Sequence, residues 1–328
     1  MYLAKKTNHK TIILALAASI VFPLAMQAGG FQYAILLGCY VQLYIIAVSG
    51  LDILFGYSGQ ISMGHAGFYA IGAYGSALLH NHFNMPIMLS ILLACVISGI
   101  VGTIIAIPAS KLVFHFLSLA TIAFGEIIYN IASHSPNNIT GNFRGMFTDR
   151  FSIFGFELKS NISVYFFGLL CVILFLLVKT RIVDSKLGRA FIAIRENEHS
   201  ANGMGVDVHK YKVLAFTISA VFTAFAGSFY AHLVGYLSPD TFVQKQSVMF
   251  VTMLLFGGSA SVQGNITGVL VILILTEALR AFKDYQMVIY GVLMIIAIVA
   301  LPGGLYGGFK DIVQRVKGKK TRDGKGAA

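Results

Sequence analysis

Charged residues are scarce in this chain. Asp, Glu, Lys and Arg make up 11% of its 328 residues, whereas hydrophobic residues make up 57%. The mean hydropathy is +0.78. A soluble globule of this size needs more polar side chains to cover its surface, whereas a lipid bilayer accepts apolar ones. The composition therefore excludes an ordinary soluble protein and indicates an integral membrane protein.

Cysteine is also rare, and its pattern excludes a cysteine-based site. Cys39, Cys95 and Cys171 are far apart in the sequence, and each lies within an apolar stretch. No two of them form a Cys-x-x-Cys pair, so we interpret them as small buried hydrophobic residues. We expect no catalytic residue, no metal ion and no cofactor bound by this chain.

A nucleotide-binding loop is missing as well. A Walker A motif needs a glycine five residues before the glycine of its Gly-Lys pair. The two Gly-Lys pairs, which begin at Gly318 and Gly324, have Val313 and Lys319 at that position. Energy for any ATP-driven process must therefore come from a partner protein.

Apolar stretches of nearly membrane-spanning length fill most of the chain, since about 20 apolar residues cross a bilayer as a helix. The ten stretches are residues 11–28, 31–48, 61–80, 87–108, 112–131, 162–178, 211–234, 247–262, 264–279 and 285–301. We predict an all-α fold, a polytopic transmembrane bundle of about ten segments. Its parts are an N-terminal tail (1–10), a transmembrane domain (11–309) and a basic C-terminal tail (310–328).

Basic residues, which give a net charge of +11, collect on one side of this predicted topology. The 179–212 loop holds seven bases against four acids, whereas the bases and acids of the 132–160 loop are nearly balanced. By the positive-inside rule, we predict that both termini and the 179–212 loop are cytoplasmic and that the 132–160 loop is external. Orientation and anionic lipid headgroups account for the basic excess, so we expect no nucleic-acid partner.

A glycine-dense stretch between residues 56 and 75 interrupts the apolar pattern with polar side chains. One interpretation is a discontinuous helix that lines a translocation path. The alternative is ordinary close packing of helices through small residues. The glycines from 257 to 264 likewise predict a broken or re-entrant element between the eighth and ninth stretches. The path candidates are Gly56, Ser58, Gln60, Ser62, Gly64, His65 and Gly67.

Three carboxylates lie within or beside the apolar stretches. Asp52, Glu126 and Glu277 would each cost several kcal/mol in lipid unless they are solvated or paired. Structural explanations exist for all three. Asp52 and Glu126 are near segment ends, and Glu277 is three residues before Arg280, a helical pair. In an ion-coupled secondary transporter they would be the coupling groups.

The 179–212 loop contains an amphipathic pattern. Asp184 or Ser185 can cap a helix that starts at Lys186, with Phe191 and Ile194 on or near one apolar face. We predict that residues 186–202 form this helix and that the glycines at 203 and 205 end it. Such an apolar face favours docking into the groove of a partner, and a solvated connector is the alternative.

Several stretches resemble one known family. Residues 56–68 (GYSGQISMGHAGF) and 71–74 (IGAY) resemble the signature of branched-chain amino acid ABC importer permeases. Residues 188–198 and 211–216 resemble the cytoplasmic coupling loop and following helix of the same family, and residues 124–128 and 304–307 add weaker matches. The resemblance covers roughly residues 40–308 and favours the LivM-like member of a LivM/LivH permease pair.

The resemblance implies a type II-like permease subunit of a bacterial inner membrane that is not itself an enzyme. Two cytoplasmic ATPase subunits would use ATP and magnesium, a second, LivH-like permease would complete the pathway, and a solute-binding protein would deliver branched-chain or related amino acids. Departures from the family pattern at 200–203 and 257–265 leave importers of urea, short amides or sugars as alternatives. An ion-coupled secondary transporter is the alternative of a different class. The residues that the resemblance assigns to ATPase docking are Gly188, Arg189, Ala190, Ile194, Arg195, Glu196, Asn197, Glu198 and Gly205.

Overall fold

A computed structural model describes residues 9–111, 114–153, 156–157 and 160–280, and beyond them 285, 288–293, 295, 304–305 and 307. It confirms the all-α prediction. The α-helices are α1 (His9–Ala28), α2 (Gln32–Asp52), α3 (His65–Phe83), α4 (Ile87–Ala109), α5 (Phe114–Ser133), α6 (Asn161–Asp184), α7 (Lys186–Glu196), α8 (Glu198–Gly203), α9 (Val208–Val234), α10 (Gln244–Gly257) and α11 (Val262–Ala278). A π-helix (Ile53–Tyr57) continues α2, and short 3-10 helices span Pro136–Asn138, Asn142–Arg144 and Pro239–Phe242.

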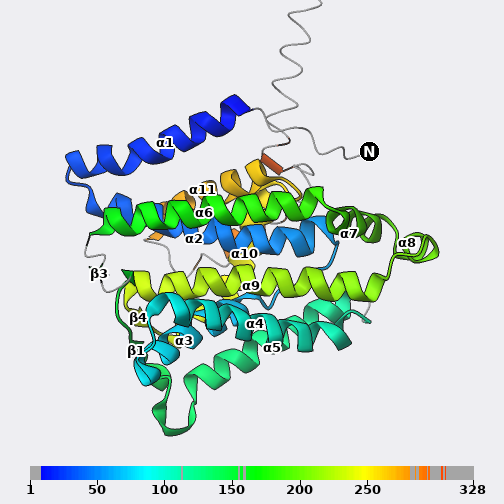
Figure 1. Ribbon diagram of the computed structural model, residues 1–328, viewed down its shortest axis with the longest axis horizontal. Helices are drawn as coiled ribbons and strands as arrows, with labels where there is room; N and C mark the ends of the chain where they lie inside the picture. The colour runs from blue at the N-terminus through cyan, green and yellow to red at the C-terminus, as the bar shows by residue number, and fades with distance from the viewer. Residues whose placement is uncertain are drawn as a thin grey trace, which may run out of the picture.

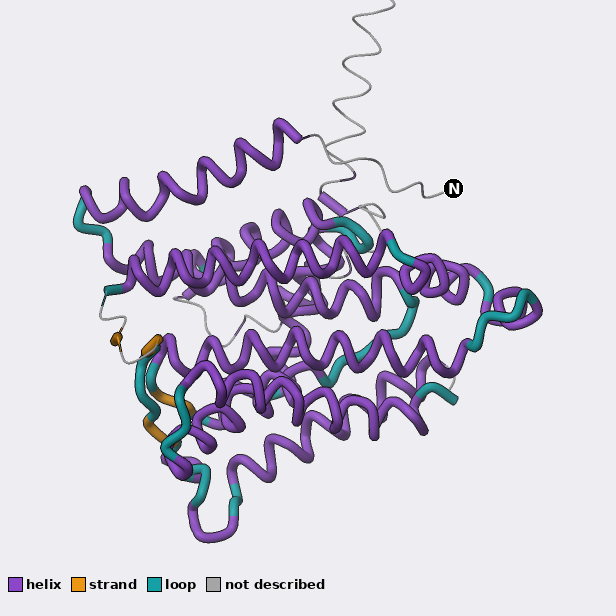
Figure 2. The backbone as a smooth tube through the Cα atoms, in the orientation of Figure 1, coloured by secondary structure: helices purple, strands orange, loops and turns teal. Residues whose placement is uncertain are grey.

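The long helices lie side by side, and the connecting segments gather at the two ends of the bundle (Figures 1 and 2). One end carries α7 and α8. The other carries four two-residue strands: β1 (Met146–Phe147) pairs antiparallel with β4 (Tyr236–Leu237), and β2 (Ser152–Ile153) with β3 (Phe156–Glu157). The loops predicted to be cytoplasmic and external therefore lie at opposite ends, while the side of the membrane that each end faces stays a prediction.

Helix α9 lies at the centre of the bundle and packs against α2, α3 and α4. Close approach to α3 depends on glycine. A Cβ on Gly72 would lie 1.9 Å from the Ala224 carbonyl oxygen, and one on Gly227 would lie 2.0 Å from that of Tyr69. The Ser228 hydroxyl donates a 2.8 Å hydrogen bond to the Gly72 carbonyl. Small residues here serve helix packing, as expected where lipid removes the hydrophobic drive for association.

Exposed aliphatic side chains cover the outer faces of α4 and α6, including Leu92, Ile104 and Leu174. This is the surface that lipid would cover. Five helical segments are long and apolar enough to cross a membrane: Gln32–Tyr57, Ile87–Ala109, Phe116–Ser133, Asn161–Asp184 and Val208–Val234. The count of ten is not established, because most of the predicted 285–301 segment, and nearly all of both tails, lie outside the described residues.

The predicted third segment, 61–80, begins too early. Residues 58–64 are not helical, and α3 starts at His65. The helical path ends at Gly59, which has a φ of +73°. The backbone N–H of Gln60 then donates a 3.1 Å hydrogen bond to the Leu54 carbonyl. The break in the α2–α3 path and the break at 258–261 between α10 and α11 agree with the two discontinuities predicted from the glycines.

The prediction of one helix over 186–202 is wrong, because Asn197 is extended and separates α7 from α8. Its side chain accepts a 2.9 Å hydrogen bond from the Ser200 amide and caps α8. The start is as predicted: Ser185 caps α7 by accepting from the Leu187 amide at 3.1 Å. Asn is among the most favourable N-cap residues, so its side chain stabilises the start of a second helix at this position.

Candidate functional site

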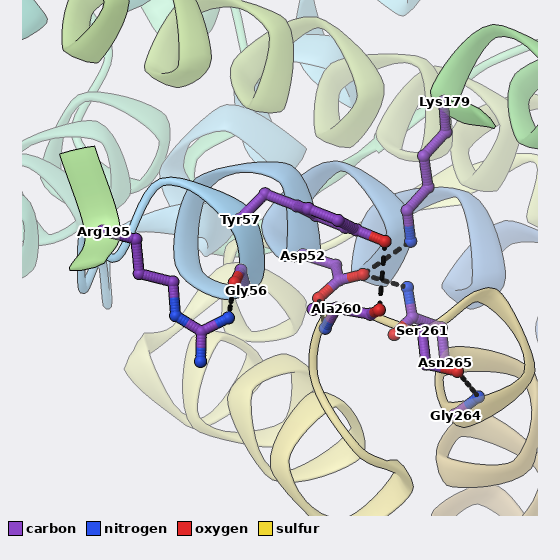
Figure 3. Close-up of polar contacts among 9 residues, drawn as sticks. All are labelled: Asp52, Gly56, Tyr57, Lys179, Arg195, Ala260, Ser261, Gly264 and Asn265. Atoms are coloured by element: carbon purple, nitrogen blue, oxygen red, sulfur yellow. Dashed lines mark hydrogen bonds and ion pairs between the residues drawn. The ribbon is translucent and has the colours of Figure 1, made fainter. Parts of the chain in front are cut away.

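A buried carboxylate organises the end of the bundle nearest α7 (Figure 3). Asp52, the last residue of α2, is fully buried. Its Oδ2 atom forms an ion pair, 2.7 Å long, with the ammonium group of Lys179 of α6, which is also fully buried. The same oxygen accepts a 3.2 Å hydrogen bond from the Asn265 side chain of α11. Three helices distant in the sequence thus meet at one charge. A buried ion pair persists only when such additional hydrogen bonds offset its desolvation.

The other oxygen of this carboxylate holds the loop between α10 and α11. Asp52 Oδ1 accepts a 2.7 Å hydrogen bond from the Ala260 amide, and Tyr57 donates its hydroxyl to the Ala260 carbonyl at 3.0 Å (Figure 3). Ala260 has a φ of +57°, which is unfavourable for a residue with a Cβ. Both polar groups of this strained residue are therefore held by the interrupted helix.

Gly56 sits in the π-helix between these two holding residues. A Cβ there would lie 2.0 Å from Asp52 Oδ1 and 2.8 Å from the Ala260 nitrogen, so no larger residue fits without displacement. Its carbonyl accepts a hydrogen bond from the Arg195 guanidinium, in the last turn of α7. The aliphatic part of Arg195 covers Gly59, since a Cβ on that glycine would lie 3.1 Å from Arg195 Cγ. Helix α7 therefore contacts the interrupted helix directly (Figure 3).

The apolar face of α7 is covered by this chain itself. Phe191 is fully buried, Ile194 is 2% exposed, and the Phe191 ring packs edge-on against Tyr211 of α9. The argument that this face is free to dock into a partner is therefore wrong. The side chains that α7 and α8 expose are polar, apart from Met204 directly after α8, which is 74% exposed.

The residues assigned to ATPase docking fall into buried and exposed groups. Gly188, Ala190 and Ile194 are buried, and a Cβ on Gly188 would lie 1.9 Å from the Val183 carbonyl oxygen. Those exposed at this end of the bundle are Arg189, Arg195, Glu196, Asn197, Glu198 and Gly205. Glu198 also forms a 2.6 Å ion pair with Lys212 of α9. Docking by this loop stays a prediction, with the exposed group as its surface.

All seven path candidates are buried within this chain and lie on one interrupted segment. Their polar partners are intramolecular. His65 bonds to Ser62 at 3.0 Å through Nδ1 and to Ser219 of α9 at 2.7 Å through Nε2. Gln60 donates to the Ser58 hydroxyl at 2.7 Å and to the Lys212 carbonyl at 3.2 Å.

The two remaining path candidates are contact points with α5. A Cβ on Gly64 would lie 2.1 Å from the Thr121 carbonyl oxygen, and one on Gly67 would lie 2.9 Å from the Phe124 ring. His65, at 1% exposure, does not face lipid. Whether any of the seven borders the path stays a prediction.

The three intramembrane carboxylates have different surroundings. Asp52 is explained by its ion pair, and Glu277 pairs with Arg280 at 3.3 Å as predicted. Glu126 is exposed on α5, and its carboxylate makes no hydrogen bond or ion pair within the part of the chain that the structure describes. No three His, Cys, Asp or Glu side chains of that part are grouped so that they could hold a metal ion.

Sequence reasoning missed Lys179, Ala260 and Asn265 as partners of Asp52. One signal was available for the lysine: it directly follows the apolar stretch 162–178, and a carboxylate at the end of another such stretch requires a cation. Nothing in the local sequence indicates the role of the Ala260 amide, because it depends on how the loop between α10 and α11 folds back.

Comparison with known proteins gives consistent matches. Residues 33–298 match the family described as "Branched-chain amino acid transport system / permease component". The high-affinity branched-chain amino acid transport system permease protein LivM of Salmonella typhimurium is 30% identical, over 91% of this chain and 75% of that protein. LivM of Escherichia coli is 30% identical, over 90% of this chain and 74% of that protein. The ribose import permease protein RbsC of Haemophilus influenzae is 23% identical, over 78% of each chain. No solved structure matches the chain.

Proposed function

Since the chain belongs to the branched-chain amino acid transport system permease family, we propose that it imports branched-chain amino acids as one permease subunit of an ATP-binding cassette transporter in a bacterial inner membrane. The family consists of permease subunits and not of enzymes. Two ATPase subunits would supply the energy. A second permease would complete the pathway, which the similarity to LivH proteins supports. A solute-binding protein would deliver the substrate.

One contact carries the mechanistic part of this proposal. The Arg195 guanidinium in α7 bonds to the Gly56 carbonyl in the π-helix, so a displacement of the polar loop would reach the interrupted helix through this contact. Helix α7 also packs on α9 through the Phe191 ring, so the same displacement would reach the core of the bundle. We therefore assign ATPase docking to the exposed side chains of α7 and α8.

The opposite end of the bundle suits contact with the solute-binding protein. Asn138 and residues 141–145 line a surface cavity of about 520 Å³ there. Phe143, which is one of them, is 57% exposed, and Phe147 in β1 is 77% exposed. Aromatic side chains exposed outside the apolar spans are characteristic of a protein contact surface.

Reconstitution tests this function. The chain, its second permease, the ATPases and the binding protein would be placed in liposomes, and uptake of labelled leucine would be measured with and without ATP. We expect ATP-dependent uptake that resists a protonophore and a sodium ionophore. Uptake driven by an ion gradient without ATP would support a secondary transporter instead. That rival is disfavoured by the pairing of both Asp52 and Glu277 with cations.

Sugar import is the second candidate, because the permeases RbsC and MglC of Haemophilus influenzae also match this chain, at 23% and 25% identity. Competition separates the two substrate classes. Excess isoleucine or valine should block leucine uptake, whereas ribose and galactose should not. ATP-dependent uptake of ribose without uptake of leucine would replace the amino acid assignment and keep the transporter class.

A further inference from the structure

The Asp52 carboxylate contacts more segments than an ion pair that only fixes two helices together would require. Its carboxylate oxygens together accept from Lys179, Asn265 and the Ala260 amide. The Ala260 amide belongs to the break between α10 and α11, and Asn265 lies in the first turn of α11. The carboxylate comes from the residue directly before the π-helix that leads into the break between α2 and α3. The charge therefore joins the two discontinuities of the membrane domain.

The loop that Asp52 holds is strained and depends on its holders. Ala260 has a φ of +57°, which is unfavourable for a residue with a Cβ, whereas Gly258 adopts its φ of +113° without that penalty. A backbone in such a conformation persists only where its surroundings impose it. Two hydrogen bonds hold Ala260 in this conformation: the Asp52 carboxylate accepts from its amide, and the Tyr57 hydroxyl donates to its carbonyl. Loss of these contacts would remove what holds Ala260 in this conformation.

The cluster is also connected to α7 at both ends of that helix. Lys179 lies on α6, shortly before Lys186 begins α7, and Arg195 in the last turn of α7 holds the Gly56 carbonyl. A displacement of α7 would therefore pull on Asp52 through its cation and on the π-helix through its backbone. Figure 3 shows these side chains pointing toward the same short stretch of helix.

We infer that Asp52 is the positioning residue of a cytoplasmic latch, formed with Tyr57, Lys179, Ala260 and Asn265, that holds the 258–261 loop closed until α7 moves. This inference rests on the proposed importer function. Release of the loop opens the path at the α7 end of the bundle, and recapture of the Ala260 amide by the carboxylate closes it. The buried Lys179 ammonium, 2.7 Å from Oδ2, holds the carboxylate so that Oδ1 points at the loop.

The test removes both charges of the latch together, because a single substitution would leave an unpaired buried ion. The double variant Asp52→Asn/Lys179→Met keeps a side-chain oxygen that can accept from the Ala260 amide but removes the ion pair. The matched control, Glu277→Gln/Arg280→Met, removes a 3.3 Å ion pair at the end of α11, outside the latch and outside the proposed docking surface. Each protein is reconstituted with its partners, and ATP hydrolysis and leucine uptake are measured in parallel.

We expect the latch variant still to hydrolyse ATP. The amount of ATP that it consumes per leucine transported should rise by about tenfold, the size of a typical coupling effect. The control should consume about as much ATP per leucine as the wild type. A second readout follows the loop itself. Ser259→Cys, in a chain whose native cysteines are replaced by alanine, is labelled from the cytoplasmic side with a membrane-impermeant maleimide. Without nucleotide, labelling should be slow in the wild-type background and fast in the latch variant.

Wild-type ATP stoichiometry together with slow labelling in the latch variant would overturn the inference and leave Asp52 as a structural staple. If the double variant does not insert, Tyr57→Phe replaces it, since that change removes only the hydroxyl that holds the Ala260 carbonyl. Tyr57→Phe should also speed labelling, and unchanged labelling would count against the latch. Failure of the wild-type assembly to take up leucine would refute the proposed function instead, because the nucleotide-free labelling comparison does not depend on substrate.

Discussion

At the residue scale, small side chains at fixed positions decide what this bundle can bring together. The seven path candidates share one segment. Five of them contact α5, α7, α9 or the loop before α11, whereas Ser58 and Ser62 bond to Gln60 and His65 within the segment. Gly56 is the clearest case. Its missing Cβ lets the Asp52 carboxylate and the Ala260 amide meet beside it.

Replacement of Gly56 by alanine should therefore destabilise the protein. The new methyl group would overlap Asp52 Oδ1, and overpacking of this kind costs about 1–3 kcal/mol. We expect a lower thermal midpoint for Gly56→Ala in detergent, and size-exclusion chromatography of heated samples would measure it. Gly203→Ala is the control, because no atom lies within 4 Å of a Cβ built on Gly203. Equal midpoints for the two variants would contradict the packing described here.

At the element scale, the 179–212 loop contains two helices whose roles differ. Helix α7 is fixed to the bundle by its apolar face, and α8 is a short exposed helix that depends on its cap. A charge placed at Ile194 would be buried within this chain, so Ile194→Glu reports on folding as well as on docking and cannot isolate docking.

Asn197→Ala should loosen α8 while leaving α7 in place. Loss of an N-cap side chain costs about 1 kcal/mol, which is a large part of the stability of a helix as short as Glu198–Gly203. Hydrogen exchange followed by mass spectrometry should show faster exchange over α8 only. Ser200→Ala changes a neighbouring side chain but keeps the capping amide, and it should exchange like the wild type. Faster exchange throughout α7 would mean that the two helices form one unit.

Met204 offers a cleaner test of docking. Its side chain is 74% exposed, so a substitution there leaves the packing of this chain intact. If the exposed side of α8 contacts an ATPase, Met204→Glu should reduce co-purification of the ATPase severalfold without changing the thermal midpoint of the permease alone. Met204→Leu keeps an apolar contact and should bind normally. Undiminished binding by the glutamate variant would place docking on another surface.

At the scale of the whole molecule, the two ends of the bundle differ in kind. One end has the basic loop with α7 and α8, and the other has the paired strands and the exposed aromatic residues (Figure 1). The charge asymmetry of the sequence orients the first end toward the cytoplasm. This orientation stays a prediction, since the arrangement of the helices is the same whichever way the bundle is inserted.

Reporter fusions test that orientation. A fusion at Asn142, at the end with the strands, should report an external position, and a fusion at Ala328 should report a cytoplasmic one. Fusions at Gly203 in the 179–212 loop should agree with Ala328. A cytoplasmic Asn142 would invert the bundle, and an external Ala328 would require an odd number of crossings.

The sequence by itself determined the membrane class, the helical architecture and the family, and it offered the two broken elements as an interpretation of the glycine positions. These properties follow from composition, from apolar run length and from glycine positions, all of which act locally along the chain. Only the tertiary structure decided that Asp52 pairs with Lys179 and holds Ala260, and that the apolar face of α7 is already covered. The reason is physical: a buried charge specifies that it needs a partner, but which distant segment supplies that partner depends on how the helices pack.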